Sequence, residues 1–166
     1  MYDELTEIDI QKMQAEIDYR TTTLRPKLIE DVQTARAFGD LSENFEYKSA
    51  KREKNRNDSR VRYLERMIKT AKVITDRSGA DTVGLFDKVV LYFEDDDETQ
   101  TIELVTTLRQ NSLKGLISKE SPLGKAILGH RAGERVTVEL GPGSYDVTIR
   151  SIEKGADDAS LDISAY

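Results

Sequence analysis

The chain has 166 residues, which allows one ordinary domain or two small ones. Its 25 basic and 31 acidic residues give a formal net charge of -6, a poor basis for free duplex binding, because affinity for phosphates needs concentrated positive charge. The absence of cysteine excludes disulfides, thiolate metal sites and a cysteine nucleophile, and a single histidine excludes a multi-histidine metal site.

The first residues, MYDELTEIDI, are acidic and lack the apolar segment of a secretory signal. No apolar run approaches the ~18 residues of a membrane span. These features favour a cytoplasmic protein with no membrane partner. Charged residues make up 34% of the chain, above the ~25% usual in globular domains, so we expect part of the molecule to be thin and solvent-exposed.

Residues 7–74 are predicted to be helical. Apart from Gly39, this stretch contains no glycine, the residue that commonly interrupts a helix. Thr6 and Asp9 resemble a capping box at the start, with Asp in place of Glu. Pro26 lies inside the first half of the stretch, where we expect it to kink the helix.

Two parts of this stretch repeat an alternating spacing of three and four, which is typical of a coiled-coil seam. The first seam contains Gln14, Ile17, Thr21, Leu24, Leu28, Asp31, Ala35 and Phe38. The second contains Tyr47, Ala50, Lys54, Asn57, Val61, Leu64, Ile68 and Ala71. In an antiparallel hairpin the numbers of facing residues have a constant sum. Pairing residues whose numbers add to 85 aligns the two seams and puts the turn near 42 and 43. The expected pairs are Ile17–Ile68, Leu24–Val61, Asp31–Lys54, Ala35–Ala50 and Phe38–Tyr47.

After residue 76 the pattern changes to segments rich in Val, Ile, Thr and Tyr, which predict strands. The predicted strands are 87–93, 99–107, 135–140 and 144–152. A short helix is expected to start after Ser121 and to stop at Gly129. The acidic run 94–98 is interpreted as a charged hairpin loop.

The predicted fold class is therefore α+β. A long N-terminal antiparallel coiled-coil hairpin (1–76) is followed by a small antiparallel-sheet domain with one short helix (77–154). A polar tail, 155–166, is expected to be mobile.

Positive charge is concentrated on the second predicted helical arm. Residues 47–72 contain three acids, Glu53, Asp58 and Glu65, against ten basic side chains. The basic ones are Lys48, Lys51, Arg52, Lys54, Arg56, Arg60, Arg62, Arg66, Lys69 and Lys72. This face is either plainly solvated or fitted to a polyanion, whose phosphates it would position without reading sequence.

The predicted turn carries acidic residues, in contrast to the basic second arm that follows it. Asp40 and Glu43 are three residues apart around it, so both carboxylates can face the same way. One interpretation is helix capping, with Asp40 as N-cap and Glu43 as its capping-box partner. The other is a shared Mg²⁺ site. Two carboxylates cannot satisfy the six ligands of Mg²⁺, so another macromolecule would have to complete the site.

Two motifs resemble those of the Gre family of bacterial transcript-cleavage factors. Residues 39–51, GDLSENFEYKSAK, are similar to the Gre tip motif. Residues 116–140, LISKESPLGKAILGHRAGERVTVEL, are similar to the second Gre motif. The resemblance extends over roughly residues 5–153.

The resemblance implies an accessory factor, not an enzyme, that binds bacterial RNA polymerase. Its C-terminal domain, of FKBP-like fold, would dock at the rim of the secondary channel, and the coiled coil would reach the active centre. The tip acids would help to hold a second Mg²⁺, and the polymerase would cut the 3′ end of backtracked nascent RNA. We expect a monomer without a small-molecule substrate.

The resemblance also assigns residues to roles. The two functional acids, which are the catalytic and metal-binding positions, correspond to Asp40 and Glu43. The basic positions near the tip that contact extruded RNA correspond to Arg36 and Lys51, and Arg52 is an extra cation beside them.

The remaining assignments are to docking and to the tip. The polymerase-docking loop corresponds to Glu120, Ser121 and Pro122. The other tip residues are Ser42, Asn44 and Phe45.

Two departures from the family pattern stand out. Phe45 replaces a residue that is commonly alanine, and its ring is expected either to stack on a base or line the channel, or to pack over Leu41. Residues 104–115, LVTTLRQNSLKG, differ from the usual I-V-G-x-x-E-A-D-x-x-x-G.

Three other functions are compatible with parts of the pattern. A channel binder that inhibits polymerase without stimulating cleavage would share the architecture, although the intact acid pair argues against it. A prolyl isomerase would need an aromatic-lined pocket, and residues 80–166 contain few aromatic side chains and no Trp. An inert coiled-coil adaptor does not explain the polar distal seam.

Overall fold

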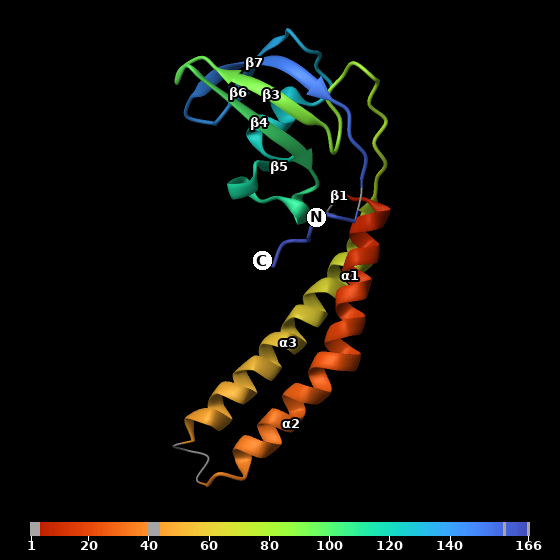
Figure 1. Ribbon diagram of the computed structural model, residues 1–166, viewed down its shortest axis with the longest axis vertical. Helices are drawn as coiled ribbons and strands as arrows, with labels where there is room; N and C mark the ends of the chain where they lie inside the picture. Colours follow the sequence, from red (N-terminus) through yellow and green to blue (C-terminus); the bar gives the residue numbers. More distant parts are fainter. Residues whose placement is uncertain (1–3, 40–43, 158, 166) are drawn as a thin grey trace. The chain divides into compact units, whose positions relative to one another are not determined.

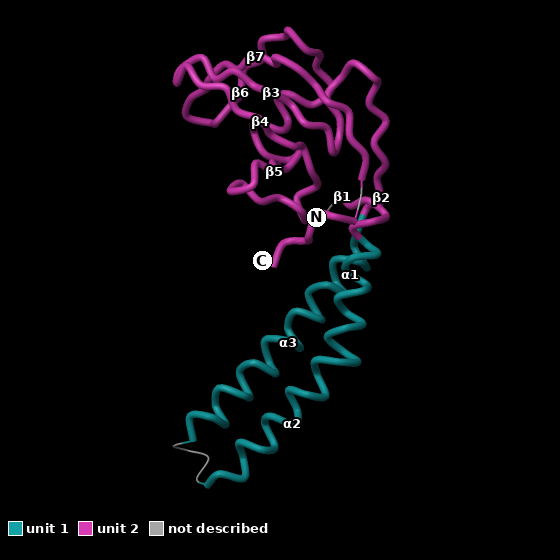
Figure 2. The backbone as a smooth tube through the Cα atoms, viewed as in Figure 1, with its two compact units in different colours: residues 1–2, 10–71 teal, residues 3–9, 72–166 magenta. Residues whose placement is uncertain are grey.

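The computed structural model describes residues 4–39, 44–157 and 159–165. The chain divides into two compact units, drawn in two colours in Figure 2. Unit 1 is Ile10–Ala71, and unit 2 comprises residues 4–9 and 72–165. Residues 4–9 and 72–76 and the described part of the predicted tail group with unit 2 in this division.

The predicted helical hairpin is confirmed (Figure 1). Its first arm runs through α1 (Glu7–Tyr19), a π-helical segment (Arg20–Leu24) and α2 (Arg25–Arg36), and its second arm is α3 (Phe45–Thr70). In the π-helical segment the Arg25 N–H donates to the Arg20 carbonyl, five residues earlier. The expected irregularity near Pro26 therefore takes the form of a π-helical segment that ends just before it.

The predicted seam holds on the second arm, where every seam residue is buried or half-buried. On the first arm it is partly wrong. Ile17 and Ala35 are buried, but so is Met13, which was not expected. The wrongly assigned seam positions, all exposed, are Gln14, Thr21, Asp31 and Phe38. The π-helical segment departs from strict heptad spacing at Thr21, which lies within it.

The predicted register is also wrong. Asn57, expected opposite Leu28, instead exchanges two hydrogen bonds with Arg20. The Arg20 guanidinium donates to Asn57 Oδ1 at 2.9 Å, and Asn57 Nδ2 donates to the Arg20 carbonyl at 3.1 Å. Lys54 forms its ion pair with Asp58 on its own helix, at 3.0 Å, rather than with Asp31. Polar partners thus fix the register, and apolar spacing alone did not reveal them.

Unit 2 contains a five-stranded sheet in the order β5-β4-β3-β7-β6. Its strands are β3 (Lys88–Phe93), β4 (Glu98–Val105), β5 (Leu116–Ser118), β6 (Arg135–Glu139) and β7 (Ser144–Glu153). The four predicted strands are confirmed. The sheet is mixed rather than wholly antiparallel, because the unpredicted β5 runs parallel to β4. A separate parallel pair joins β1 (Glu4–Leu5) to β2 (Lys72–Val73).

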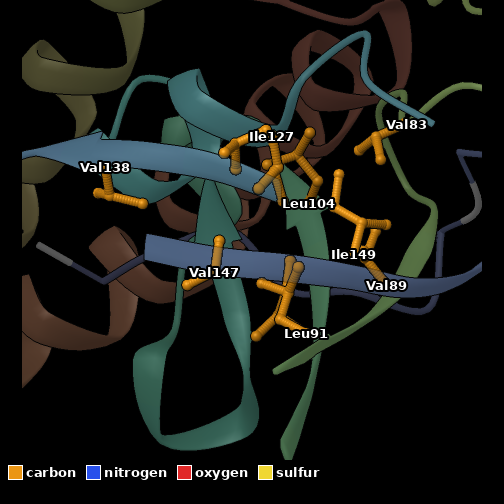
Figure 3. Packing of buried hydrophobic residues seen from close by; sticks show 10 residues of the cluster. Val83, Val89, Leu91, Leu104, Ile127, Val138, Val147 and Ile149 are labelled. Carbon is orange, nitrogen blue, oxygen red and sulfur yellow. The ribbon is translucent and has the colours of Figure 1, made fainter. Parts of the chain in front are cut away.

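The core of unit 2 lies between the sheet and α4 (Pro122–Ile127), as Figure 3 shows. Ile127 packs with the buried side chains Val83, Val89, Leu91, Ile102, Leu104, Val136, Val138, Val147 and Ile149. The predicted start and stop of the short helix are confirmed. Ser121 Oγ accepts the Gly124 N–H at 3.0 Å, and Gly129 has a left-handed φ of +81°.

The segment that departs from the family pattern contains two 3₁₀ turns, Thr107–Arg109 and Ser112–Lys114. Arg109 is fully buried and contacts two carboxylates, Asp9 and Asp157, each at 2.5 Å. Its guanidinium also lies 5.0 Å from the centroid of the Phe86 ring. Asp157 belongs to the polar tail, 155–166, and its pairing with Arg109 joins this part of the tail to unit 2.

Within residues 4–39, 44–157 and 159–165, every helix is too short or too polar to cross a membrane. The Thr6–Asp9 capping box is confirmed at the start of α1. The Thr6 N–H donates to Asp9 Oδ2 at 3.0 Å, and the Asp9 N–H donates to Thr6 Oγ1 at 3.2 Å.

Candidate functional site

The candidate site is the end of the hairpin, where the first arm closes at Arg36 and the second begins at Phe45. We call residues 36–39 and 44–52 the apex. Gly39 has a φ of +126°, a backbone conformation that favours glycine. The predicted acids Asp40 and Glu43, and Ser42 between them, lie outside the described residues.

Asn44 is the N-cap of α3. Its side-chain oxygen accepts the Tyr47 N–H at 3.0 Å, and its amide nitrogen donates to the Ala35 carbonyl at 2.7 Å. One side chain therefore caps the second arm and ties it to the first. The prediction that Asp40 caps this helix is wrong, and a stricter use of N-cap preference would have selected Asn44. The capping requirement of α3 is met without the two acids.

Tyr47 brings together two of the cations assigned to RNA contact. The Arg36 guanidinium lies 5.6 Å from the ring centroid, and the Lys51 ammonium lies 5.9 Å from it. Hydrogen bonding with Arg36, and secondly the charge of Lys51, hold the pKa of the Tyr47 hydroxyl below its ordinary value. The sequence identified both cations but gave Tyr47 only a place in the seam.

Phe45 is the first residue of α3 and is 83% exposed. The Lys48 ammonium lies 5.9 Å from the centroid of its ring. Arg52, the third predicted RNA contact, is exposed on the same helix two turns later. Phe38, at the end of the other arm, is 69% exposed. The apex therefore presents both cationic and aromatic groups to solvent.

The predicted docking residues lie in unit 2, at the turn that leads into α4. Ser121 uses its hydroxyl fully, accepting from the Gly124 N–H and donating to the Ser118 carbonyl at 2.7 Å. A Cβ on Gly124 would lie 2.1 Å from that same carbonyl oxygen, so only glycine fits here. The result is a fixed turn that exposes Glu120 and Pro122.

The Arg109 cluster was missed by sequence reasoning. Arg109 occupies the position of the acid in the family pattern, which was a signal that the segment differs. Its partner Asp9 lies 100 residues away in the sequence, and no local pattern connects the two. Thr106 also donates to Asp9, at 2.8 Å. Arg109 and Asp9 are buried, and both carboxylates pair with the guanidinium, so the cluster is structural rather than a second reactive site.

Asp40 and Glu43 fit Mg²⁺ in kind but not in number. Carboxylate oxygens are the donors that Mg²⁺ prefers, yet two residues leave most of its six positions unfilled. Among the residues that the structure describes, no three His, Cys, Asp or Glu side chains are grouped so as to hold a metal ion. Further ligands would have to come from a partner.

Comparison with known proteins covers both units. Residues 4–73 match the family described as "Transcription elongation factor, N-terminal", and residues 78–154 match "Transcription elongation factor, GreA/GreB, C-term". Transcription elongation factor GreA of Bacillus subtilis is 39% identical over 142 residues, covering 86% of this chain and 90% of that protein. GreA of Oenococcus oeni is 39% identical over 146 residues, covering 87% and 90%. The crystal structure of GreA factor homolog 1 (Gfh1) of Thermus thermophilus is 24% identical, covers 93% of this chain and 100% of that chain, and has a TM-score of 0.43.

Proposed function

The chain belongs to the GreA/GreB family of transcription elongation factors, and from this premise we propose that it binds bacterial RNA polymerase and stimulates cleavage of backtracked RNA. The resemblance inferred from the sequence is confirmed by these matches. The observation that carries the proposal is the intact acid pair, Asp40 and Glu43, within a tip motif of the matched N-terminal family. An inhibitory channel binder would need docking but not these acids.

In this proposal the chain lends ligands to the active centre of the polymerase and is an accessory factor rather than an enzyme. Asp40 and Glu43 each supply a carboxylate to a Mg²⁺ ion that the polymerase also holds. When bound, such an ion can lower the pKa of a water and stabilise the charge that develops during phosphodiester cleavage. Asn44 supports this role, because it is the N-cap of α3, so that neither acid is needed for that position.

The cations of the apex hold the 3′ end of the nascent RNA. Arg36 and Lys51 flank Tyr47 from different arms, and Arg52 lies one residue beyond Lys51. Cations of this kind position phosphates without reading sequence, which suits a factor that must act on any backtracked transcript.

Docking is assigned to the turn at Glu120, Ser121 and Pro122, whose backbone is fixed by the Ser121 cap and by Gly124. A fixed turn can present the same surface to the rim of the secondary channel at little cost in conformational entropy. We further propose that the chain acts as a cytoplasmic monomer, with no membrane or small-molecule partner.

The test is a backtracked elongation complex with cognate polymerase, Mg²⁺ and end-labelled RNA. The wild-type chain should release a 3′ fragment faster than polymerase alone, and Asp40→Ala and Glu43→Ala should each lose the stimulation. Asp96→Ala, which changes an exposed acid in unit 2, is the control and should retain it. If the wild type releases no fragment but slows synthesis, the inhibitory function replaces the proposal. If Asp40→Ala and Glu43→Ala match the wild type, the acids are wrongly assigned.

A second measurement tests the basic face. Lys51→Glu combined with Arg52→Glu should weaken crosslinking of the RNA 3′ end to the chain. The matched control is Arg66→Glu with Lys69→Glu, two cations near the other end of α3. Equal crosslinking by both double variants would mean that the basic face is solvated and that Lys51 and Arg52 do not contact the RNA.

A further inference from the structure

The Phe45 side chain takes no part in the buried seam of the hairpin. It is 83% exposed, although it begins the helix that carries the second arm. The cap and the link to the first arm are both supplied by Asn44, next to it in sequence. Packing and capping therefore give no reason for an aromatic side chain at this position.

The charges around Phe45 are divided between its two sides. At 3.6 residues per turn, Arg52 and Lys48 lie roughly 20° and 60° around the α3 axis on one side. Glu53 and Glu46 lie roughly 80° and 100° around on the other side. Phe45 thus lies at the border between a cationic and an acidic flank of the same helix.

A shallow groove on the acidic side reinforces this division. It has a volume of about 470 Å³, runs between the two arms and is bordered by the Phe45 ring. Three carboxylates line it, from Asp31, Glu46 and Glu53. Because these acids repel phosphates, a nucleic-acid backbone is confined to the side of Lys48 and Arg52.

We propose that Phe45 is a stacking platform for a nucleobase at the 3′ end of the extruded RNA, with the phosphates following Lys48 and Arg52. The proposal rests on the proposed function, and it adds a base contact that the acids and cations do not provide. Aromatic rings stack on any of the four bases, because each base has a π-face. The Lys48 ammonium lies 5.9 Å from the ring centroid, close enough to attract the phosphate that adjoins a stacked base.

The test removes the base rather than only the ring. Backtracked complexes are prepared with either normal or abasic residues at the two extruded 3′ nucleotides, and binding of the labelled chain is measured with Ca²⁺ in place of Mg²⁺. The wild type should bind the complex with bases roughly five- to tenfold more tightly than the abasic one. Phe45→Ala should bind both complexes equally, and Phe45→Trp should keep the preference for bases.

Phe38→Ala is the matched control, because Phe38 is the other exposed aromatic residue among those described at the apex. It should retain the preference for bases. The proposal is overturned if Phe45→Ala keeps the preference for bases. It is also overturned if Phe45→Ala weakens binding to both complexes by the same factor, which would indicate a contact with the polymerase.

Cleavage of the normal complex by the wild type, measured in parallel with Mg²⁺, distinguishes the stacking role of Phe45 from the proposed function of the chain. Stimulated cleavage without a base preference overturns the stacking role and leaves the proposed function standing. Absence of both binding and stimulated cleavage overturns both.

Discussion

The two units rely on different interactions for their internal structure. In unit 2 the sheet and α4 enclose ten buried apolar side chains in one cluster. In unit 1 the buried positions include Asn57 and Arg60 beside Ile17 and Leu64. An apolar cluster contributes stability in proportion to the area that it buries, whereas polar groups in a helical seam contribute mainly by fixing register. Unit 2 is thus stabilised mainly by buried apolar side chains, whereas unit 1 is a solvent-exposed hairpin with polar groups among its buried positions.

Burial also changes along the hairpin. Met13, Ile17 and Leu64 are buried, whereas Ala35 is the buried apolar residue nearest the apex among those described, and Phe38 and Phe45 are exposed. Residues that hold the fold and residues that are free to bind are therefore separated along unit 1. Substitutions should divide in the same way, with large losses of stability in unit 2 and small ones at the apex.

The largest effect on stability is expected at Arg109. Arg109→Met would leave Asp9 and Asp157 without their cation in a buried site, which should lower the free energy of unfolding by about 3–5 kcal/mol. Urea unfolding followed by circular dichroism measures it. The control is Arg131→Met, whose ion pair with Asp81 is exposed and should be worth less than about 1 kcal/mol. Equal losses for both variants would contradict a structural role for the cluster.

A smaller loss is expected from the apolar core of unit 2. Leu104 is fully buried on β4, so Leu104→Ala should lower the free energy of unfolding by about 2–4 kcal/mol through lost burial and the cavity left behind. Leu113→Ala, at a residue that is 98% exposed, should change it by less than about 0.5 kcal/mol. If Leu113→Ala proved as costly as Leu104→Ala, the assignment of the core would be wrong.

In unit 1 the corresponding effect should be smaller and should depend on pH. Burial raises the pKa of Glu16, but hydrogen bonding and charge from Arg60 outweigh it and hold that pKa below its ordinary value. A carboxylate with a depressed folded-state pKa stabilises the fold above its unfolded pKa, and this contribution is lost as the pH falls through the folded value. Arg60→Gln should therefore cost about 1–2 kcal/mol at pH 7.

The same cost should shrink as the pH falls through the lowered pKa of Glu16, because the carboxylate then becomes protonated. Urea unfolding at pH 7 and pH 3 measures the difference, with Arg56→Gln, whose pair with Glu53 is exposed, as the control. A cost for Arg60→Gln that is unchanged between the two pH values would mean that the ion pair does not stabilise the hairpin.

The smallest effect on stability is expected at the apex. Tyr47→Phe should change the free energy of unfolding by less than about 0.5 kcal/mol. The ultraviolet titration of the wild type minus that of Tyr47→Phe should show a tyrosine with a pKa below its ordinary value, because Arg36 and Lys51 favour the ionised form. Arg36→Gln should raise that pKa. A Tyr47 pKa that is unaffected by this change would mean that Arg36 does not interact with the Tyr47 hydroxyl.

The sequence predicted the elements of the fold well, because their signals are local. Strand composition located β3, β4, β6 and β7, and the Ser121–Pro122 pair located the start of α4. The parallel strand β5 was missed, because three residues are too few to show a period. Register was predicted wrongly, because it depends on contacts such as Arg20 with Asn57, which lie 37 residues apart.

The candidate site was predicted in part, and for a similar reason. Arg36 and Lys51 were identified through the family resemblance, but their meeting at Tyr47 depends on a contact between the two arms that the resemblance does not specify. Asn44 was assigned to the tip without its role as a cap and link. The Arg109 cluster could not be predicted, since its partners lie in distant segments of the chain.

The central claim, that Asp40 and Glu43 complete a metal site of the polymerase, is tested most directly by the Mg²⁺ dependence of cleavage. The rate of cleavage in a backtracked complex is measured against Mg²⁺ concentration for polymerase alone, with the wild-type chain and with Glu43→Gln. We expect the wild type to lower the Mg²⁺ concentration needed for half-maximal cleavage, and Glu43→Gln to return it toward that of polymerase alone. The same Mg²⁺ dependence in all three cases would contradict the claim.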